Sequence, residues 1–261
     1  MRKEAKHIMR SNQKGQIIFR NRSSADFGIY CKTPITIPTP QLDVTATHIN
    51  GRNGDLLQTY GSFKNIDIVV DVTVFKPNQY TSLYQLKNEI VDWLTGFDYD
   101  YLKFSENPNW VFEAIVSTPP SLVPLSEVSA EMELTGQIAF NCKPLMLKTP
   151  SIRWQEVRPV VYNTEKLPAM PDWHIVGTGN FKLIVNGLEY QFSNVQKEIF
   201  IDGENCQAYS IDVQGNKVNC NSDVTWENND APILQTGQNT ISWSGDGITK
   251  IEYKPKFRRL A

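Results

Sequence analysis

The sequence lacks any apolar run long enough to cross a membrane, because nowhere do about 18 consecutive apolar residues occur. We expect no secretory signal, since no apolar run follows the charged residues near residue 1. Its formal net charge is only -2, so no global electrostatic signal points to nucleic acid or to an anionic membrane. We therefore expect no membrane partner and no sequence-specific nucleic-acid contact.

Cysteine is scarce, and its spacing excludes the common metal and disulfide frameworks. The four cysteines lie far apart and form no Cys-x-x-Cys pair. We expect buried free thiols and no bound metal. Glycines 51, 54 and 61 are not followed by Gly-Lys-Ser/Thr, so they form no phosphate loop, and we expect no nucleotide or other cofactor.

Catalytic constellations are also missing. Hydrolysis by paired carboxylates requires two acids that flank one bond, and the nearest candidates are Asp98 with Asp100 and Asp202 with Glu204. Both pairs lie where turns or strand faces are expected, which favours solvated surface acids. The three histidines, at 7, 48 and 174, accompany neither a Gly-x-Ser-x-Gly elbow nor a recognisable cysteine nucleophile. We predict that the protein is not an enzyme.

Two binding hypotheses deserve testing against the fold. Asp230, Asp246 and the asparagines near them offer oxygen ligands for calcium, but their spacing does not follow an EF-hand loop, and turn chemistry explains them better. Trp173, His174 and Trp226 are candidate sugar contacts in the second half of the chain, which holds four of the six tryptophans. Packing in a β-sheet core explains large aromatic residues equally well.

What the sequence does contain is a glycine-bounded turn between extended segments. Gly51, Arg52, Asn53, Gly54 and Asp55 combine positive-φ residues with an Asn-Gly pair, which predicts strand, turn, strand. From residue 63 onward apolar and polar residues alternate with a period near two, as in a half-buried strand. Residues 34–40 alternate prolines with β-branched residues, which favours an extended, poorly paired connection or an exposed arm.

One helix is predicted over residues 80–94, where five apolar residues recur on one face. Ser82 and Gln85 form a possible capping box, with Asn78 and Thr81 as competing caps, and Gly96 supplies a stop. Strands surround this helix, so the first half is α+β. After prolines at 144, 150 and 159, short strands separated by Gly- and Asn-rich turns predict a β-sandwich. We place the two domains at residues 1–148 and 149–261.

Several short motifs occur in a recognisable order. Asp-Phe-Gly at 26–28 precedes Gly-Arg-x-Gly-Asp-Leu at 51–56 and Phe-Lys-Asn-Ile-Asp-Ile at 63–68. Phe-x-Cys-Lys-Pro at 140–144 closes the first half, and Thr-Ile-Ser-Trp-Ser-Gly at 240–245 precedes Thr-Lys-Ile-Glu-Tyr-Lys-Pro at 249–255. In order and spacing these motifs resemble the distal tail (Dit) proteins of siphophages, whose hosts are mostly Gram-positive bacteria.

The resemblance implies a structural protein of the phage tail tip. It implies a homo-hexameric ring of tail-tube-like first domains around the DNA channel, with galectin-like sandwiches outside. Implied partners are the tail tube protein, a tail-associated lysin or fibre hub, and receptor-binding or upper baseplate proteins, in a virion assembled in the host cytoplasm. The His-x-Asn-Pro-Arg signature of sugar-binding galectins is absent. Binding of host cell-wall polysaccharide therefore ranks second, as the alternative function. For ring contacts we select residues 51–60, with Arg52 and Asp55 foremost, and residues 34–40.

Overall fold

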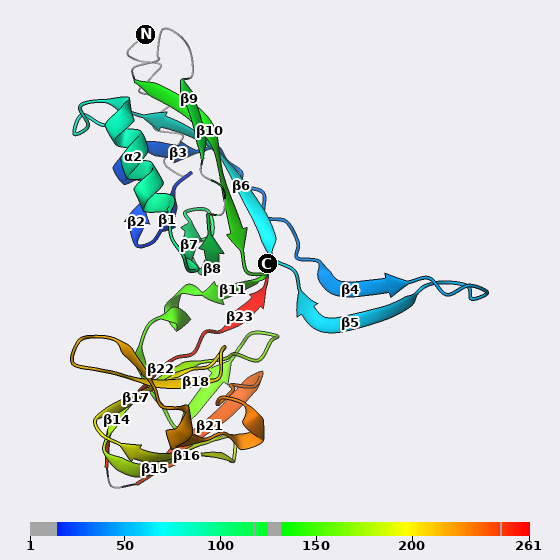
Figure 1. Ribbon diagram of the computed structural model, residues 1–261, viewed down its shortest axis with the longest axis vertical. Helices are drawn as coiled ribbons and strands as arrows, with labels where there is room; N and C mark the ends of the chain where they lie inside the picture. The colour runs from blue at the N-terminus through cyan, green and yellow to red at the C-terminus, as the bar shows by residue number, and fades with distance from the viewer. Residues whose placement is uncertain (1–14, 117, 119, 125–131, 246) are drawn as a thin grey trace. The chain divides into compact units, whose positions relative to one another are not determined.

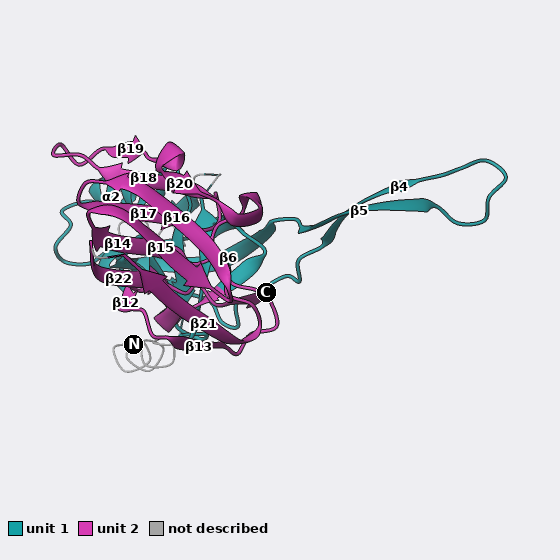
Figure 2. Ribbon diagram, turned by 90° about the horizontal axis from the view of Figure 1, so that it is seen from below, with its two compact units in different colours: residues 1–146, 260–261 teal, residues 147–259 magenta. Residues whose placement is uncertain are grey.

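The computed structural model describes residues 15–116, 118, 120–124, 132–245 and 247–261. The chain divides into two compact units, residues 1–146 with 260–261 and residues 147–259, which are coloured separately in Figure 2. The division falls between Met146 and Leu147, and the last two residues return to the first unit. Three segments in which apolar and polar residues alternate correspond closely to strands of the first unit. They are Tyr99–Phe104, Trp110–Val116 and Met132–Phe140.

The first unit is built on an antiparallel sheet with the strand order β2-β1-β7-β8-β10-β6-β3, and β9 pairs with β10 (Figure 1). The longest pairing joins β6 and β10 over ten residues. The strands are β1 (Ile17–Phe19), β2 (Arg22–Ser23), β3 (Ile29–Cys31), β6 (Ile66–Phe75), β7 (Asp100–Phe104), β8 (Trp110–Ile115), β9 (Ser121–Pro124) and β10 (Glu133–Cys142).

Helix α2 (Leu83–Leu94) buries Leu86, Ile90, Trp93 and Leu94, the face that the periodicity predicts. Trp93 stacks on Phe27 at a centroid distance of 4.6 Å and donates its indole N–H to the carbonyl oxygen of Phe19 at 2.8 Å. The helix is therefore fixed to the strands by both apolar packing and a buried hydrogen bond.

The ends of α2 differ from the prediction in detail. The Ser82 hydroxyl accepts the N–H of Gln85 at 3.2 Å, which is one half of a capping box. The Gln85 side chain accepts from the N–H and hydroxyl of Thr81 instead of completing the box. Thr95 ends the helix in an extended conformation, so Gly96 does not serve as a left-handed stop.

The second unit consists of two antiparallel sheets that share one apolar core. One sheet has the order β12-β22-β14-β17-β18-β19 and the other β13-β21-β15-β16-β20. Their strands are β12 (Gln155–Glu156), β13 (Val160–Asn163), β14 (Asp172–Gly177), β15 (Gly179–Val185), β16 (Leu188–Val195), β17 (Glu198–Asp202), β18 (Gln207–Ile211), β19 (Lys217–Asn219), β20 (Val224–Thr225), β21 (Gly237–Ser244) and β22 (Ile248–Lys254).

Short elements complete the description. The strands β11 (Leu145–Lys148) and β23 (Arg258–Leu260) contain the two points at which the chain passes between the units. The 3₁₀ turns among the described residues are η2 (Ser24–Phe27), η3 (Thr149–Ile152), η4 (Asn221–Asp223) and η5 (Glu227–Asn229). Ala169 and Leu234 form an isolated bridge outside the named strands.

Candidate interaction surfaces

A separate two-stranded hairpin, which we call the arm, projects from the first unit (Figures 1 and 2). It pairs β4 (Leu42–Thr47) with β5 (Leu56–Phe63). Gly51 and Gly54 have φ values of 82° and 80° at its tip, so the predicted strand-turn-strand is confirmed. A lone two-stranded hairpin is marginally stable in water. The arm therefore gains most from a partner that covers it.

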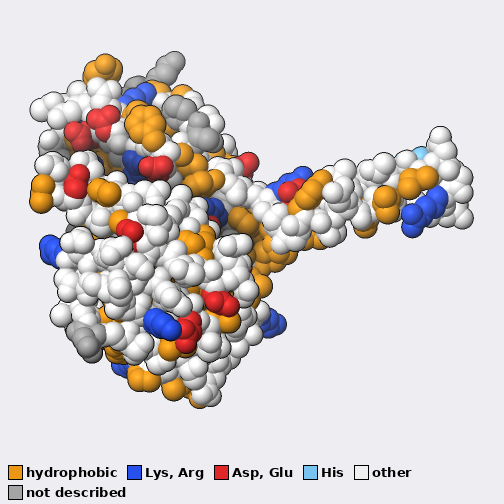
Figure 3. All heavy atoms as spheres, turned by 60° about the horizontal axis from the view of Figure 1, so that its bottom comes forward, with side chains coloured by type: hydrophobic (Ala, Val, Ile, Leu, Met, Phe, Trp, Pro, Cys, Tyr) orange, Lys and Arg blue, Asp and Glu red, His pale blue; other side chains and the backbone are white. Residues whose placement is uncertain are grey.

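The arm carries apolar side chains that nothing in the described chain covers. Leu42 is 44% exposed, Leu56 47%, Leu57 63% and Tyr60 54%. Figure 3 shows hydrophobic side chains spread along its length. Exposed apolar groups gathered on one element mark a surface for association.

The residues selected for ring contacts, Gly51, Arg52, Asn53, Gly54 and Asp55, all lie at the tip of the arm. The Asp55 carboxylate lies 3.3 Å from Nδ1 of His48, so one member of the predicted polar pair already has a contact within the chain. The backbone N–H of Arg52 donates to the Ile49 carbonyl oxygen at 3.1 Å and closes the turn.

The second surface is the outer face of the six-stranded sheet. His174 lies between two glutamates, with Nε2 2.9 Å from Glu198 and Nδ1 3.5 Å from Glu252. Strand register places His174 opposite Phe200, and Phe200 opposite Tyr209. A hydrogen bond from Lys250 is the main cause that holds the pKa of Glu252 below its usual value. We call His174, Phe200 and Tyr209 the ring row.

The rings of this row stack on one another. The centroids of His174 and Phe200 are 4.1 Å apart with an interplanar angle of 3°, and those of Phe200 and Tyr209 are 5.3 Å apart at 12°. The ammonium of Lys217 lies 4.4 Å from the Tyr209 ring centre, and that of Lys254 lies 4.6 Å from the Trp154 ring centre. Aromatic faces are the part of a ring on which ligands stack, and here they contact other side chains of the chain.

The three candidate sugar contacts are not brought together. Trp173 is fully buried in the core, where it stacks on Tyr253 at 5.5 Å. His174 follows it on the same strand and therefore points to the outer face. Trp226 packs against the apolar core of the second unit. Sequence reasoning missed the ring row, because its members are far apart in sequence and only strand register aligns them.

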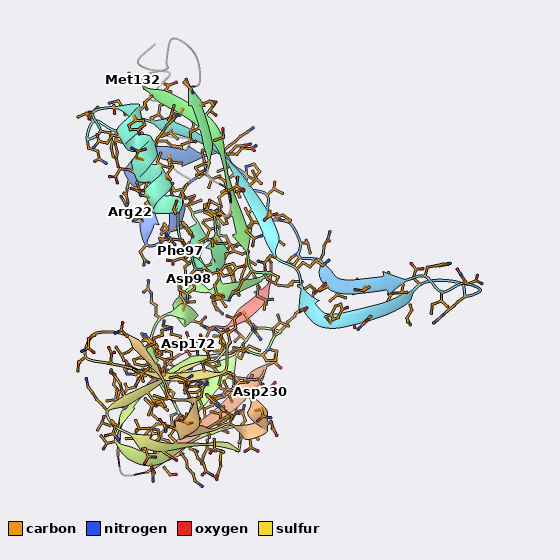
Figure 4. All side chains as sticks on the ribbon, in the orientation of Figure 1. Arg22, Phe97, Asp98, Met132, Asp172 and Asp230 are labelled. Carbon is orange, nitrogen blue, oxygen red and sulfur yellow. The ribbon has the colours of Figure 1, made fainter. Side chains whose placement is uncertain are left out.

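Among the acidic candidates, Asp202 has structural contacts. The Asp202 carboxylate accepts the backbone N–H groups of Glu204 and Asn205, each at 3.1 Å. Burial acts against its charge, but the hydrogen bonds from Asn205 and Glu204 and the nearby Lys256 hold the pKa of Asp202 below its usual range. Asp98 lies beside the fully exposed Phe97 (Figure 4). Among the described residues no group of three metal-binding side chains forms; Asp246 and His7 lie outside them.

Burial keeps two thiols unreactive. It raises the pKa of Cys31 to about 12 and raises that of Cys142 further. All four cysteines are free. No helix within the described part of the chain is long and apolar enough to span a membrane.

The described chain thus consists of two β-rich units, the first of which carries an exposed hairpin. No family model matches the sequence, and no curated protein does. A crystal structure does match: SPP1 Dit (gp 19.1), described as a paradigm of the hub adsorption apparatus in Gram-positive infecting phages. The match has a TM-score of 0.57 and 12% sequence identity and covers 94% of this chain and 99% of that one. The fold therefore resembles that of SPP1 Dit, a member of the family to which the motifs pointed.

Proposed function

We propose that this protein is a structural component of a phage tail tip: a distal tail protein that assembles as a hexameric ring. The observation that carries the proposal is the fold likeness to SPP1 Dit over nearly the whole of both chains. The ring surrounds the DNA channel and joins the tail tube to the tail-tip hub and to receptor-binding proteins. The role is non-enzymatic, and the second unit is a galectin-like sandwich.

The polar face of β6 and β10 supports a role beside passing DNA. The Asp67 carboxylate accepts from the Asn141 side chain at 2.8 Å, and that of Asp71 accepts from Gln137 at 2.8 Å. Alternation places the odd-numbered residues of both strands on this face, and none of them is lysine or arginine. Basic groups bind DNA phosphates by releasing counterions. A face with acids and amides but no basic group lets DNA slide, and we propose that it lines the channel.

The exposed arm supports a role in ring closure. A ring requires two different faces of one subunit to complement each other. The arm offers one such face because its larger apolar side chains stay about half exposed in the described chain. We propose that the arm, including its tip, contacts the neighbouring subunit.

Light scattering after size exclusion over a range of concentrations, with negative-stain images of the largest species, tests the proposal. Six-membered rings, single or stacked in pairs, are the expected result. A glycan array or a titration with host cell-wall polysaccharide tests the alternative, since a scaffold shows no saturable binding. A chain that stays monomeric and binds polysaccharide saturably contradicts the tail-hub role.

A further inference from the structure

The arm and the body are parts of one long β-ribbon that is interrupted in the middle. On the body side the last bond joins the N–H of Lys32 to the Asp71 carbonyl oxygen at 2.8 Å. On the arm side the first bond joins the N–H of Lys64 to the Gln41 carbonyl oxygen, also at 2.8 Å. Within the described chain, no backbone hydrogen bond joins residues 33–40 to residues 65–70. Figure 1 shows both connecting stretches as coil between β3 and β4 and between β5 and β6.

The prolines explain the interruption. Pro34, Pro38 and Pro40 have no N–H to donate to a ladder. Ile35 and Ile37, which alternate with them, pack against the core of the first unit. The prediction that residues 34–40 form a poorly paired connection is therefore confirmed. A cavity of about 220 Å³ remains at the body end, between residues 32–36 and residues 69–71.

The interruption leaves part of β6 as an open sheet edge. Lys32 bonds the Asp71 carbonyl, and the N–H of Phe75 bonds the Gly28 carbonyl at 2.9 Å, so odd-numbered residues of β6 direct their backbone groups toward β3. Backbone groups alternate in direction along a strand. Asp67 and Val69 therefore direct N–H and C=O groups to the same side, beyond the end of β3, and Val69 is 47% exposed. Such an edge is a template for an added strand.

The arm contains a strand whose pattern fits this edge. Along β4 apolar residues alternate with polar ones, which is the signature of a strand with one buried face. In the single chain neither face is buried. On the apolar face of β4, two of the three cross-strand partners in β5 are also apolar: Phe63 lies opposite Leu42, and Leu57 lies opposite Ala46. The polar positions 43, 45 and 47 contain no basic residue, like the polar face of β6 and β10.

We propose that β4 of a second copy of this chain adds as a strand to β6 between Ile66 and Val70. Backbone hydrogen bonds to Asp67 and Val69 supply affinity, and the alternation of β4 fixes which face turns inward, as in other strand-addition complexes. Its apolar residues then lie toward Ile35 and Ile37, and its polar residues continue the face of Asp67 and Asp71. This inference rests on the proposed ring and specifies how neighbouring subunits join.

Chains with one accessible cysteine each test the pairing, since Cys31 and Cys142 are buried. In a background with Cys206→Ser and Cys220→Ser, one chain carries Val69→Cys and a second carries one cysteine at position 43, 44, 45, 46 or 47. The two are purified separately, mixed and oxidised, and disulfide-linked dimers are measured on non-reducing gels. Disulfides require Cα atoms roughly 4.4 to 6.8 Å apart, so the yield should be several-fold higher at odd positions than at 44 and 46. Val213→Cys, on a residue that is 97% exposed in the second unit, is the matched control.

A second pair of variants tests the backbone donor. Val69→Pro removes the N–H that faces the open edge, and proline is tolerated where that group faces solvent. Val69→Ala shortens the same side chain but keeps the N–H. We expect Val69→Pro to lose assembly and Val69→Ala to keep it, with thermal unfolding showing that both are folded.

The outcomes separate this inference from the proposed ring. Alternating cross-links support strand addition whether or not closed rings are seen. Wild-type rings without cross-links, or with equal yields at odd and even positions, overturn the inference and leave the ring in place. A wild-type chain that stays monomeric at every concentration and gives no cross-link overturns both.

Discussion

The arm and the ring row are both solvent-facing, but they differ in what they still need. In the ring row each aromatic face meets another ring or an ammonium, and His174 has a glutamate at each nitrogen. In the arm, by contrast, Leu42, Leu56, Leu57 and Tyr60 remain 44–63% exposed, and among the described strands β4 and β5 pair only with each other. The first surface is complete within one chain. The second leaves apolar side chains exposed that a partner could cover.

This difference is the reason why we propose the arm, and not the ring row, as the surface for association. Exposure alone does not, since folded proteins expose many apolar atoms. Two features distinguish this part of the first unit. Strand β4 of the arm alternates apolar and polar residues but buries neither face, and the edge of β6 directs N–H donors beyond the end of β3. One partner strand can satisfy both features. The ring row contributes stability to its own sheet instead.

Removing the arm should have the largest effect. Replacement of residues 42–63 by a short Gly-Ser turn joins Gln41 to Lys64, which already share a backbone hydrogen bond. We expect complete loss of rings and no change in the unfolding midpoints of the two units, because the arm contributes nothing to either core. Light scattering and thermal unfolding measure both. Retained rings would show that other faces of the first unit suffice.

A core residue and its outward neighbour should respond differently. Trp173→Ala removes a fully buried indole and should destabilise the second unit by about 3–5 kcal/mol. Phe200→Ala on the ring row removes two stacked contacts and should cost about 1–2 kcal/mol. Chemical denaturation measures both free energies, and assembly of folded Phe200→Ala should be unchanged. If a Phe200→Ala chain folds normally but no longer assembles into hexamers, the ring row of aromatic side chains lies in a subunit interface.

Much of the fold follows from local pattern, but pairing does not. The helical face of α2, the turn at Gly51 and Gly54, and the strands near Asp100, Trp110 and Glu133 follow from periodicity and turn chemistry. The end of α2 differs because Thr95 leaves the helical conformation before Gly96 is reached. That detail depends on the chain that follows the helix, not on glycine's own freedom.

Candidate sites show the same limit more clearly. The sequence suggests Arg52 and Asp55 because both lie on one predicted turn, but it does not reveal the contact of Asp55 with His48. The ring row and the open edge of β6 depend on register between residues that are distant in sequence. Trp173 and His174 look like one site in the sequence, but adjacent residues of a strand face opposite sides of the sheet.

Asp202 gives a smaller, pH-dependent effect. Its pKa is lowered in the folded state, so its contribution is present above the unfolded value near 3.9 and is lost as the pH falls through the folded value. Asp202→Asn keeps the shape of the side chain but removes the negative charge of the carboxylate that accepts two backbone N–H groups. We expect a loss of about 1 kcal/mol at pH 7 that shrinks below about pH 4. Urea unfolding at both pH values measures this; a gap independent of pH would assign the loss to geometry instead of charge. Loss of peptidoglycan clearing in this variant would indicate an enzyme.

The smallest effect is expected at the tip of the arm. The double variant Arg52→Ala with Asp55→Ala removes exposed charges, and exposed ion pairs contribute about 0.2–1 kcal/mol each. Because a closed ring repeats one interface at every subunit, a small loss per contact still raises the concentration at which half of the chains are assembled. We expect a several-fold rise, measured by light scattering across a dilution series. His48→Ala is the control, since it removes the intrachain contact of Asp55 and leaves both tested charges. If the double variant assembles like the wild type, the hydrogen bonds and apolar face of β4 hold the arm in place and the tip charges do not.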